Sequence, residues 1–294
     1  MQSSLRPIVA GVACLFAATS VLADETDDAL KKAVTFYASF DNDVRADYGK
    51  GGVTLSTRYT VDAKRGRYER KPGFPRKVFR IAKDRGVSGG ALEAVDVLPR
   101  GGRIYFPAKG NVAYRKGGWS GAASLWLNTN PNTMLKTKYC DPLQITERGA
   151  TNGGIWCDFT PDKPRDFRLG VFAAVKPGKK PRPTTGPKAP VVRVKGVGFK
   201  AGDWHHVVLS WKNLDSGKPN AEASLYIDGK QIGTVDKRAI AMNWVVDKAG
   251  IYVAVSYIGL LDELALFNRS LTADEVRRLH KNPRLLAGLK SPAK

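Results

Sequence analysis

The chain has 294 residues, of which 43% are hydrophobic and 9% aromatic, with 48 Lys plus Arg against 27 Asp plus Glu. Such a composition excludes a disordered chain, and three cysteines are too few for a disulfide-dense scaffold. We therefore expect a globular protein, long enough for one large β domain or two small ones. The formal net charge of +21 favours attraction to polyanions but says nothing about the fold.

The first 23 residues have the pattern of a secretory signal peptide. Arg6 is followed by the apolar run Ile8 to Ala18 and by small residues that end at Ala23. The apolar run is shorter than the roughly 20 residues that cross a bilayer, although an uncleaved anchor is the alternative. We expect cleavage after Ala23, a mature chain without a membrane span, and a periplasmic or extracellular location.

Two segments carry much of the positive charge. Lys64 to Arg85 holds ten basic and two acidic residues, and its prolines should interrupt regular structure. Lys176 to Lys195 holds seven basic residues, five prolines and no acid, which predicts an extended, solvated loop. Export separates the chain from nucleic acid, and no nucleic-acid-binding motif is present, so the expected partner is an anionic polysaccharide or envelope polymer. A basic, solvated surface without a specific partner is the alternative.

The remaining pattern is that of a β protein. Val34 to Phe40, Ser120 to Asn128 and Trp204 to Trp211 have the composition of half-buried or central strands, and Asp228-Gly229 is typical of a tight hairpin turn. The one strong helix signal is the capping box Thr272 to Glu275. Shorter strands are expected at residues 104–106, 143–146, 154–159, 167–171, 225–227 and 231–233. We therefore predict a sandwich followed by a late helix.

Cys140 and Cys157 lie almost symmetrically about the turn-rich segment Glu147 to Gly154. In an antiparallel hairpin they would face each other at a separation that suits a disulfide. We predict this disulfide, which would stabilise the fold by about 3 kcal/mol in the chain-entropy model. Two buried free thiols are the alternative, and no CxxC or nearby His completes a zinc site.

Several segments resemble the laminin-G-like, concanavalin-A-like jelly-roll family. They are FKAGDWHHVVLSW from Phe199, ASLYIDGK from Ala223 and YIGLLDELALFNRSLT from Tyr257, with Ser120 to Leu127 and FYASFD from Phe36 in addition. The resemblance implies an all-β, two-sheet antiparallel jelly-roll sandwich of about 12 to 14 strands with a short C-terminal helix. It implies one domain over residues 24–280, with basic insertions near 64–86 and 176–195 and a basic tail at 281–294.

The family includes lectins, adhesion modules, glycosidases and polysaccharide lyases, so function depends on the site. A retaining glycosidase needs two carboxylates about 5 Å apart on one strand face. Asp262 and Glu263 are adjacent and should point to opposite faces, so we expect Asp262 to fix the backbone or a cation and Glu263 to be solvated. A lyase motif is incomplete, because Thr146 stands where a His is needed. Asp41 and Asp262 resemble positions near a structural calcium site of the family.

The candidate ligand-binding residues are aromatic and basic. Trp119, Trp156 and Trp244 border turns and could stack on sugar rings, with core packing as the alternative. Lys179, Lys180 and Arg182 could bind an anion. The sequence thus predicts an exported, non-catalytic module that binds carbohydrate, most favourably an anionic polysaccharide. The alternatives are a cell-envelope structural or protein-interaction domain and, after it, a polysaccharide lyase or glycoside hydrolase.

Overall fold

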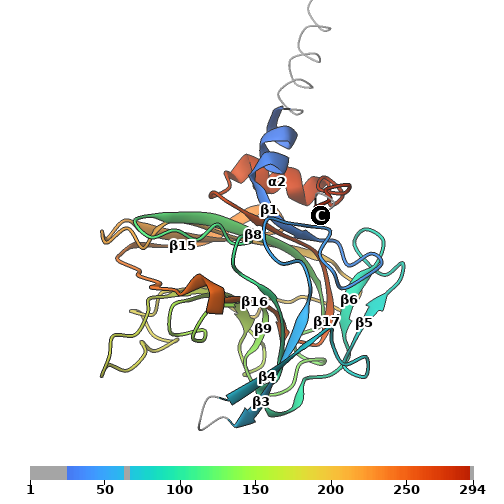
Figure 1. Cartoon of the computed structure of the whole chain (residues 1–294), viewed down its shortest axis with the longest axis horizontal. Helices are drawn as coiled ribbons and strands as arrows, with labels where there is room; N and C mark the ends of the chain where they lie inside the picture. Colours follow the sequence, from blue (N-terminus) through green and yellow to red (C-terminus); the bar gives the residue numbers. More distant parts are fainter. Residues whose placement is uncertain (1–24, 63–66, 292–294) are drawn as a thin grey trace, which may run out of the picture.

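The computed structural model describes residues 25–62 and 67–291. Within these residues two antiparallel β-sheets pack against each other, and helices lie outside one of them (Figure 1). The two-sheet jelly roll with a short C-terminal helix, as predicted from the sequence, is confirmed. The expected signal peptide, residues 1–23, lies outside the described residues. Among the described residues, none of the helices has the length and hydrophobicity needed to cross a bilayer.

The nine-stranded sheet has β8 in the middle of its longest path. The strands follow the order β15-β14-β13-β8-β17-β1-β2, while β6 pairs with β17 and β5 pairs with β6. Alternating apolar residues of β8 and β17 bury one face of each strand in the core. The bounds are β1 (Val34–Ala38), β2 (Tyr48–Gly49), β5 (Phe79–Ala82), β6 (Ala91–Ala94), β8 (Trp119–Asn128), β13 (His205–Leu214), β14 (Ala221–Ile227), β15 (Lys230–Arg238) and β17 (Gly259–Phe267).

The eight-stranded sheet lies across the core from the first. Its order is β12-β11-β10-β9-β16-β7-β3-β4, so β12 and β4 are its edges. The bounds are β3 (Ser56–Asp62), β4 (Arg67–Pro72), β7 (Arg103–Pro107), β9 (Cys140–Thr146), β10 (Gly154–Phe159), β11 (Phe167–Phe172), β12 (Val191–Val194) and β16 (Gly250–Val255).

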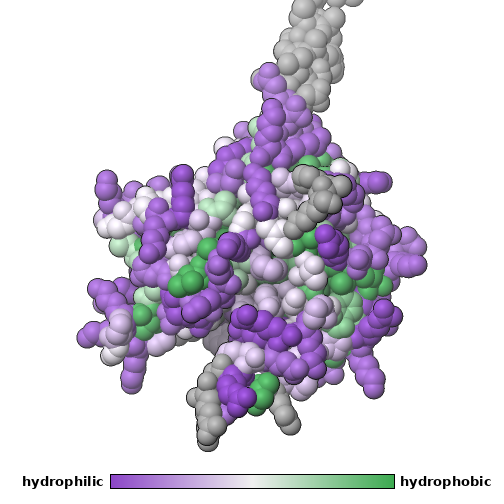
Figure 2. All heavy atoms as spheres, in the orientation of Figure 1, coloured by the Kyte–Doolittle hydropathy of each residue, from purple (hydrophilic) through white to green (hydrophobic). Residues whose placement is uncertain are grey.

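The main core fills the space between the sheets. Leu125 of β8 and Ile155 of β10 are fully buried there, and the rings of Phe36 and Phe106 join β1 to β7 with centroids 4.8 Å apart. Burial of a side chain of this size stabilises the fold by about 1.5 to 3 kcal/mol. On the surface, Figure 2 shows mostly hydrophilic residues with small, separate hydrophobic patches on the visible face.

The outer face of the nine-stranded sheet is covered by helical segments. Helix α2 (Ala273–Lys281) begins with the predicted capping box, in which the Thr272 side chain accepts from the Glu275 backbone and the Glu275 side chain accepts from the Thr272 backbone. A second helical segment, residues 25–33, was not predicted from the sequence. Val276 of α2 and Leu286 of the C-terminal segment are buried in the same cluster on this face. Short 3-10 helices occupy Pro99–Gly101 and Val246–Lys248.

The two basic segments differ from each other in structure. Residues 173–190 contain no helix or strand, as their prolines predict, and β12 follows. The described part of the first segment, in contrast, contributes strands β4 and β5, and its Pro-Gly stretch interrupts regular structure between them, at residues 73–78, as the sequence predicts. Pro72 is compatible with β4 because it ends an edge strand, where its missing N–H leaves no partner unpaired.

Candidate functional site

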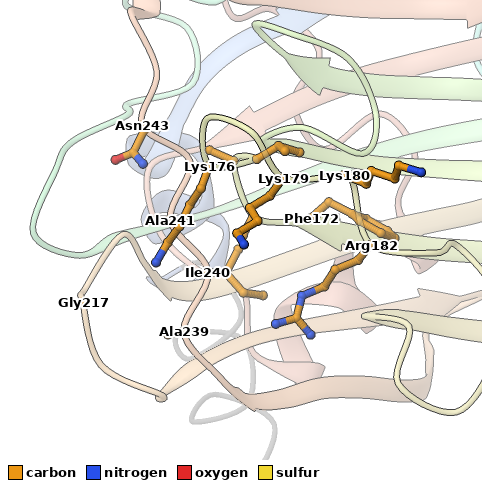
Figure 3. Close-up of a pocket in the computed structure, with 13 residues that line it drawn as sticks. Phe172, Lys176, Lys179, Lys180, Arg182, Gly217, Ala239, Ile240, Ala241 and Asn243 are labelled. Carbon is orange, nitrogen blue, oxygen red and sulfur yellow. The ribbon is translucent and has the colours of Figure 1, made fainter.

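A cavity of about 470 Å³ opens between the loop that follows β11 and the segment 239–243 (Figure 3). Four of its lining residues are cations and none is acidic. The walls between the cations are largely apolar. We call this cavity the basic pocket; its cations are Lys176, Lys179, Lys180 and Arg182, and Phe172, Ala173, Ile240 and Ala241 are among its apolar residues.

The four cations are exposed, and none of them makes an ion pair within residues 25–62 and 67–291. In Figure 3 the side chains of Lys176, Lys179 and Arg182 extend toward the segment 239–241, whereas Lys180 points away from them. Their charges are therefore available to an anion in the pocket. We therefore expect Lys180 to contribute less to anion binding than the other three cations.

The basic surface continues beyond the pocket. A neighbouring cavity of about 290 Å³ shares Arg182 and Ile240 with it. This second cavity adds Lys237 and Arg238, at the end of β15. Since the two cavities share lining residues and neither lining includes an acid, they offer one continuous positive surface.

Asp215 holds the 239–243 wall of the pocket in place. Its Oδ1 accepts a hydrogen bond from the Met242 backbone at 2.8 Å, and its Oδ2 accepts one from the Tyr114 hydroxyl at 2.8 Å. The Tyr114 oxygen in turn accepts from the Trp244 backbone at 3.2 Å. Burial, together with the bond to Asp215, raises the pKa of Tyr114 to about 12, so the phenol stays protonated and keeps donating.

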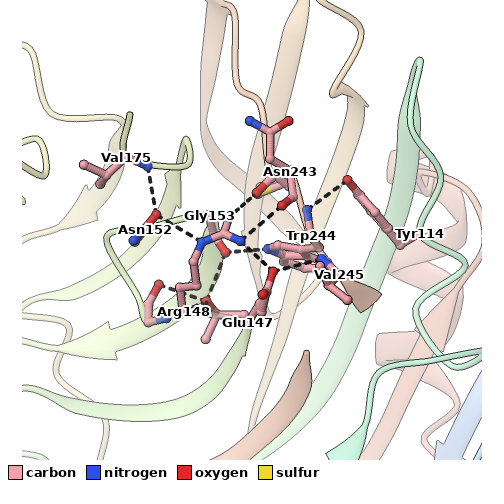
Figure 4. Close-up of polar contacts among 12 residues, drawn as sticks. Tyr114, Glu147, Arg148, Asn152, Gly153, Val175, Asn243, Trp244 and Val245 are labelled. Atoms are coloured by element: carbon pink, nitrogen blue, oxygen red, sulfur yellow. Dashed lines mark hydrogen bonds and ion pairs between the residues drawn. The ribbon is translucent and has the colours of Figure 1, made fainter. Parts of the chain in front are cut away.

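Arg148 binds the same wall from the other side (Figure 4). Its Nη2 donates to the Met242 carbonyl at 2.7 Å, and its Nη1 donates to the Asn243 carbonyl at 3.1 Å and to Glu147 at 2.6 Å. Asn152 accepts from the Val175 backbone at 2.8 Å, which ties the cationic loop to this network. The pocket therefore has a frame that hydrogen bonds fix on both sides.

The structure brings together the three basic residues that the sequence analysis selected. Lys179, Lys180 and Arg182 all line the basic pocket, and Lys176 from the same segment joins them. Sequence reasoning missed Asp215 and Arg148, because their role depends on contacts with residues distant in the chain. It also missed the 239–243 wall, whose sequence contains no charged residue.

The tryptophans selected as ligand candidates do not expose their rings. Trp119 and Trp244 are 0% and 4% exposed and pack against each other in the core, with ring centroids 5.0 Å apart. Trp156 is 1% exposed, beneath Phe172 and the Arg168 guanidinium. The ring fits there because its neighbour on β11 is Gly170, which has no side chain. A Cβ at this position would lie 2.1 Å from the ring. The expected stacking of these rings on a sugar is therefore wrong.

Asp41 and Asp262 do not fit a calcium site. Asp262 Oδ2 accepts from the Val87 backbone at 2.8 Å, and Asp41 Oδ1 accepts from the Gly90 backbone at 2.9 Å. Burial and the neighbouring Glu263 raise the pKa of Asp262 to about 9. Both carboxyls thus hold the turn at residues 86–90 through backbone N–H groups. In the described part of the chain, no three His, Cys, Asp or Glu side chains group as metal ligands.

Glu263 is buried, and the prediction that it is solvated is wrong. A β-bulge with a positive φ of 51° at this residue turns its side chain inward, where it is 5% exposed. The Tyr37 hydroxyl donates to it at 2.7 Å. Burial is the main cause that raises the pKa of Glu263 to about 8, with Asp41 and Asp47 adding to it.

The predicted disulfide is also wrong, because Cys140 and Cys157 are free and buried. Cys157 lies opposite Leu143, while Cys140 lies opposite Phe159 beyond a bulge. The two cysteines are thus diagonal rather than facing, and diagonal neighbours are about 7 Å apart, too far for an S–S bond. Burial raises the pKa of the Cys140 thiol to about 11, so it stays protonated.

Comparison with solved structures shows the same fold in several binding domains. The binding domain of Paraclostridial Mosquitocidal Protein 1 is 11% identical with a TM-score of 0.51, over 86% of this chain and 53% of that one. The ligand binding domain of Botulinum neurotoxin serotype D, solved in complex with N-acetylneuraminic acid, is 9% identical with a TM-score of 0.53, over 87% and 52%. The chain thus spans about half the length of these toxin domains.

Another similar structure is domain 4 of AbnA, an extracellular arabinanase from Geobacillus stearothermophilus, in complex with arabinotriose. It is 20% identical with a TM-score of 0.49, over 84% of this chain and 98% of that one. No curated protein matches the sequence. Residues 120–277, more than half of the chain, match the family described as Laminin_G_3, concanavalin A-like lectin/glucanases superfamily. The chain therefore belongs to this laminin-G-like family of the concanavalin A-like superfamily.

Proposed function

We propose that this protein is an exported, non-catalytic carbohydrate-binding module that takes an anionic glycan in the basic pocket. The observation that carries the proposal is a set of four cations around one cavity, none of them ion-paired within the described residues, with no acid in the cavity lining. In a solvated pocket each charge attracts an anion by a modest amount, but several charges on one rigid frame act together. The apolar walls would contact the faces of the sugar rings.

The comparisons support the class of ligand. The family description includes lectins, and a toxin domain of the same fold was solved with N-acetylneuraminic acid, an acidic sugar. The chain's excess of basic residues fits an acidic sugar better than a neutral one. The signal-peptide pattern of residues 1–23 supports an extracytoplasmic location, where such polymers occur.

The placement of the carboxyl groups supports binding without catalysis. Glu263 and Asp262 are engaged with Tyr37 and with backbone N–H groups, and neither lines the basic pocket. A glycosidase would instead present two carboxyls to the bound sugar. The module would then retain its glycan unchanged.

Calorimetric titration of the full-length protein tests the proposal. We expect trigalacturonate and a heparin-derived tetrasaccharide to bind, with affinity that falls as salt rises, and neutral galactotriose to bind far more weakly. The same mixtures are assayed for new reducing or unsaturated ends. Equal affinity for the neutral sugar contradicts the anionic ligand, and release of such ends contradicts the absence of catalysis.

A further inference from the structure

Three arginines stand side by side on the outer face of the eight-stranded sheet. Arg58 of β3 is directly opposite Arg70 of β4 on one side and Arg103 of β7 on the other. Directly opposite residues of antiparallel strands share a face, and neighbouring strands are about 4.8 Å apart. We call these residues the arginine row.

The arginine row has little compensation from carboxylates in the described part of the chain. Within residues 25–62 and 67–291, none of the three arginines makes an ion pair. Like charges directly opposite each other destabilise a sheet. Asp141, whose charge acts on Arg103, is buried beside Asp158, and this burial raises the pKa of Asp141. One carboxyl whose charged form is disfavoured by burial does not balance three arginines.

The guanidinium groups have donors to spare. Each carries five N–H donors. Arg58 donates to the Tyr252 hydroxyl at 3.0 Å, and Arg103 donates to Gln144 at 2.7 Å. The Nε of Arg58 is buried and has no hydrogen-bond partner among the described residues. An oxyanion over the row would accept from the solvent-facing donors of these groups, and planar guanidinium groups suit it.

Tyrosine rings hold the row in position. The Arg58 guanidinium lies 4.4 Å from the centroid of Tyr68 and 5.0 Å from that of Tyr252, and Arg103 lies 5.6 Å from Tyr252. These contacts fix the planes of both guanidinium groups before any ligand arrives. Preorganised donors lose less entropy on binding. Tyr68, which is 47% exposed, also leaves ring surface free at the edge of the row.

We propose that the arginine row is a second binding site, which takes the carboxylate or sulfate groups of an acidic sugar chain. Its residues do not line the basic pocket, so this proposal can be tested independently of the proposal for that site. A sugar chain fits better than a nucleic acid, which needs open aromatic faces for base stacking. Tyr252, the ring between two guanidinium groups, is only 3% exposed.

The test uses a protein that lacks the three pocket cations that extend toward the segment 239–241, so that binding at the row can be followed separately. A variant with Lys176→Ala, Lys179→Ala and Arg182→Ala is titrated by calorimetry with trigalacturonate, the heparin-derived tetrasaccharide, galactotriose and oligo-dT. Arg70→Gln and Arg103→Gln are then added. Arg76→Gln and Arg115→Gln, two exposed arginines outside the row, serve as a control of equal charge.

We expect the row substitutions to weaken binding of an acidic sugar by about tenfold or more, and the control pair to have little effect. A comparison of trigalacturonate with the sulfated, heparin-derived tetrasaccharide shows whether the row prefers carboxylate or sulfate groups. We also expect Arg70→Gln alone to leave the melting temperature of the free protein unchanged or higher, because it relieves repulsion with Arg58. Equal affinity in the row and control variants would overturn the proposal, as would a preference for oligo-dT. Loss of all binding on removal of the pocket cations alone would overturn it too, while leaving the basic pocket supported.

Discussion

Removal of the inward-pointing cations should abolish most of the binding to the basic pocket. Lys176→Ala, Lys179→Ala and Arg182→Ala remove three positive charges from a cavity of about 470 Å³ without touching its hydrogen-bonded frame. We therefore expect the variant to fold with unchanged stability. The matched control removes Lys31, Arg45 and Lys83, which are exposed and lie outside the pocket.

The size of the effect follows from electrostatics in a solvated cavity. Two unit charges 4 Å apart attract each other by about 1 kcal/mol in water, and exposed pairs measure about 0.2 to 1 kcal/mol. Three such contacts with an acidic trisaccharide are worth about 0.6 to 3 kcal/mol, or roughly 3- to 150-fold in Kd. Lys180→Ala alone should cost less than Lys176→Ala alone, because Lys180 points away from the other cations.

Calorimetric titration with trigalacturonate at low and high salt provides the measurement. The Debye length shrinks from about 10 Å at 0.1 M to about 3 Å at 1 M salt. The native protein should therefore lose much of its affinity across this range, and the triple variant should lose less, because fewer positive charges remain to attract the sugar. If the control variant loses as much affinity as the pocket variant, the attraction comes from overall charge, and the assignment of the pocket is refuted.

Three further changes test the frame and the core. Asp215→Ala removes the acceptor of Met242, so it should lower stability by about 1.5 to 3 kcal/mol in urea unfolding and weaken binding to the pocket. Gly170→Ala places a Cβ 2.1 Å from Trp156 and should cost about 1 to 3 kcal/mol, whereas an unchanged unfolding midpoint would show that this ring can move. Glu263 has a pKa of about 8 in the folded state and 4.5 in the unfolded state, so the folded state binds more protons between these pH values. The free energy of unfolding should therefore fall as pH rises from 4.5 to 8, by up to about 1.4 kcal/mol per pH unit. Glu263→Gln should flatten this slope, and an unaltered slope would contradict the reasoning.

Local sequence patterns were sufficient for a sandwich with a late helix, and the family resemblance supplied the jelly roll. The alternation along Ser120 to Asn128 predicted β8, the Asp228-Gly229 turn predicted the β14–β15 hairpin, and the capping box at Thr272 predicted α2. These features depend on residues a few positions apart, so they can be predicted without knowledge of the rest of the chain. The helix at residues 25–33 was missed because its short segment carries no capping signal of comparable strength.

Only part of the candidate site could be predicted from the sequence. Clustered Lys and Arg between prolines indicated an exposed cationic loop, because unpaired charges and prolines are excluded from sheet interiors. The opposite wall and its supports, Asp215 and Arg148, come from segments that meet the loop only in the folded chain. The arginine row likewise joins three strands, and its register is set by long-range pairing.

Composition, charge and strand periodicity were thus determined by the sequence itself, since each is a property of neighbouring residues. The tertiary structure alone decided which side chains face solvent. Trp119 and Trp244 border turns yet pack inward. The register of the β9–β10 hairpin places Leu143 rather than Cys140 opposite Cys157, and a bulge in β17 buries Glu263. A shift of one residue in register changes the face of a strand on which every following side chain lies, and only the pairing of distant strands sets that register.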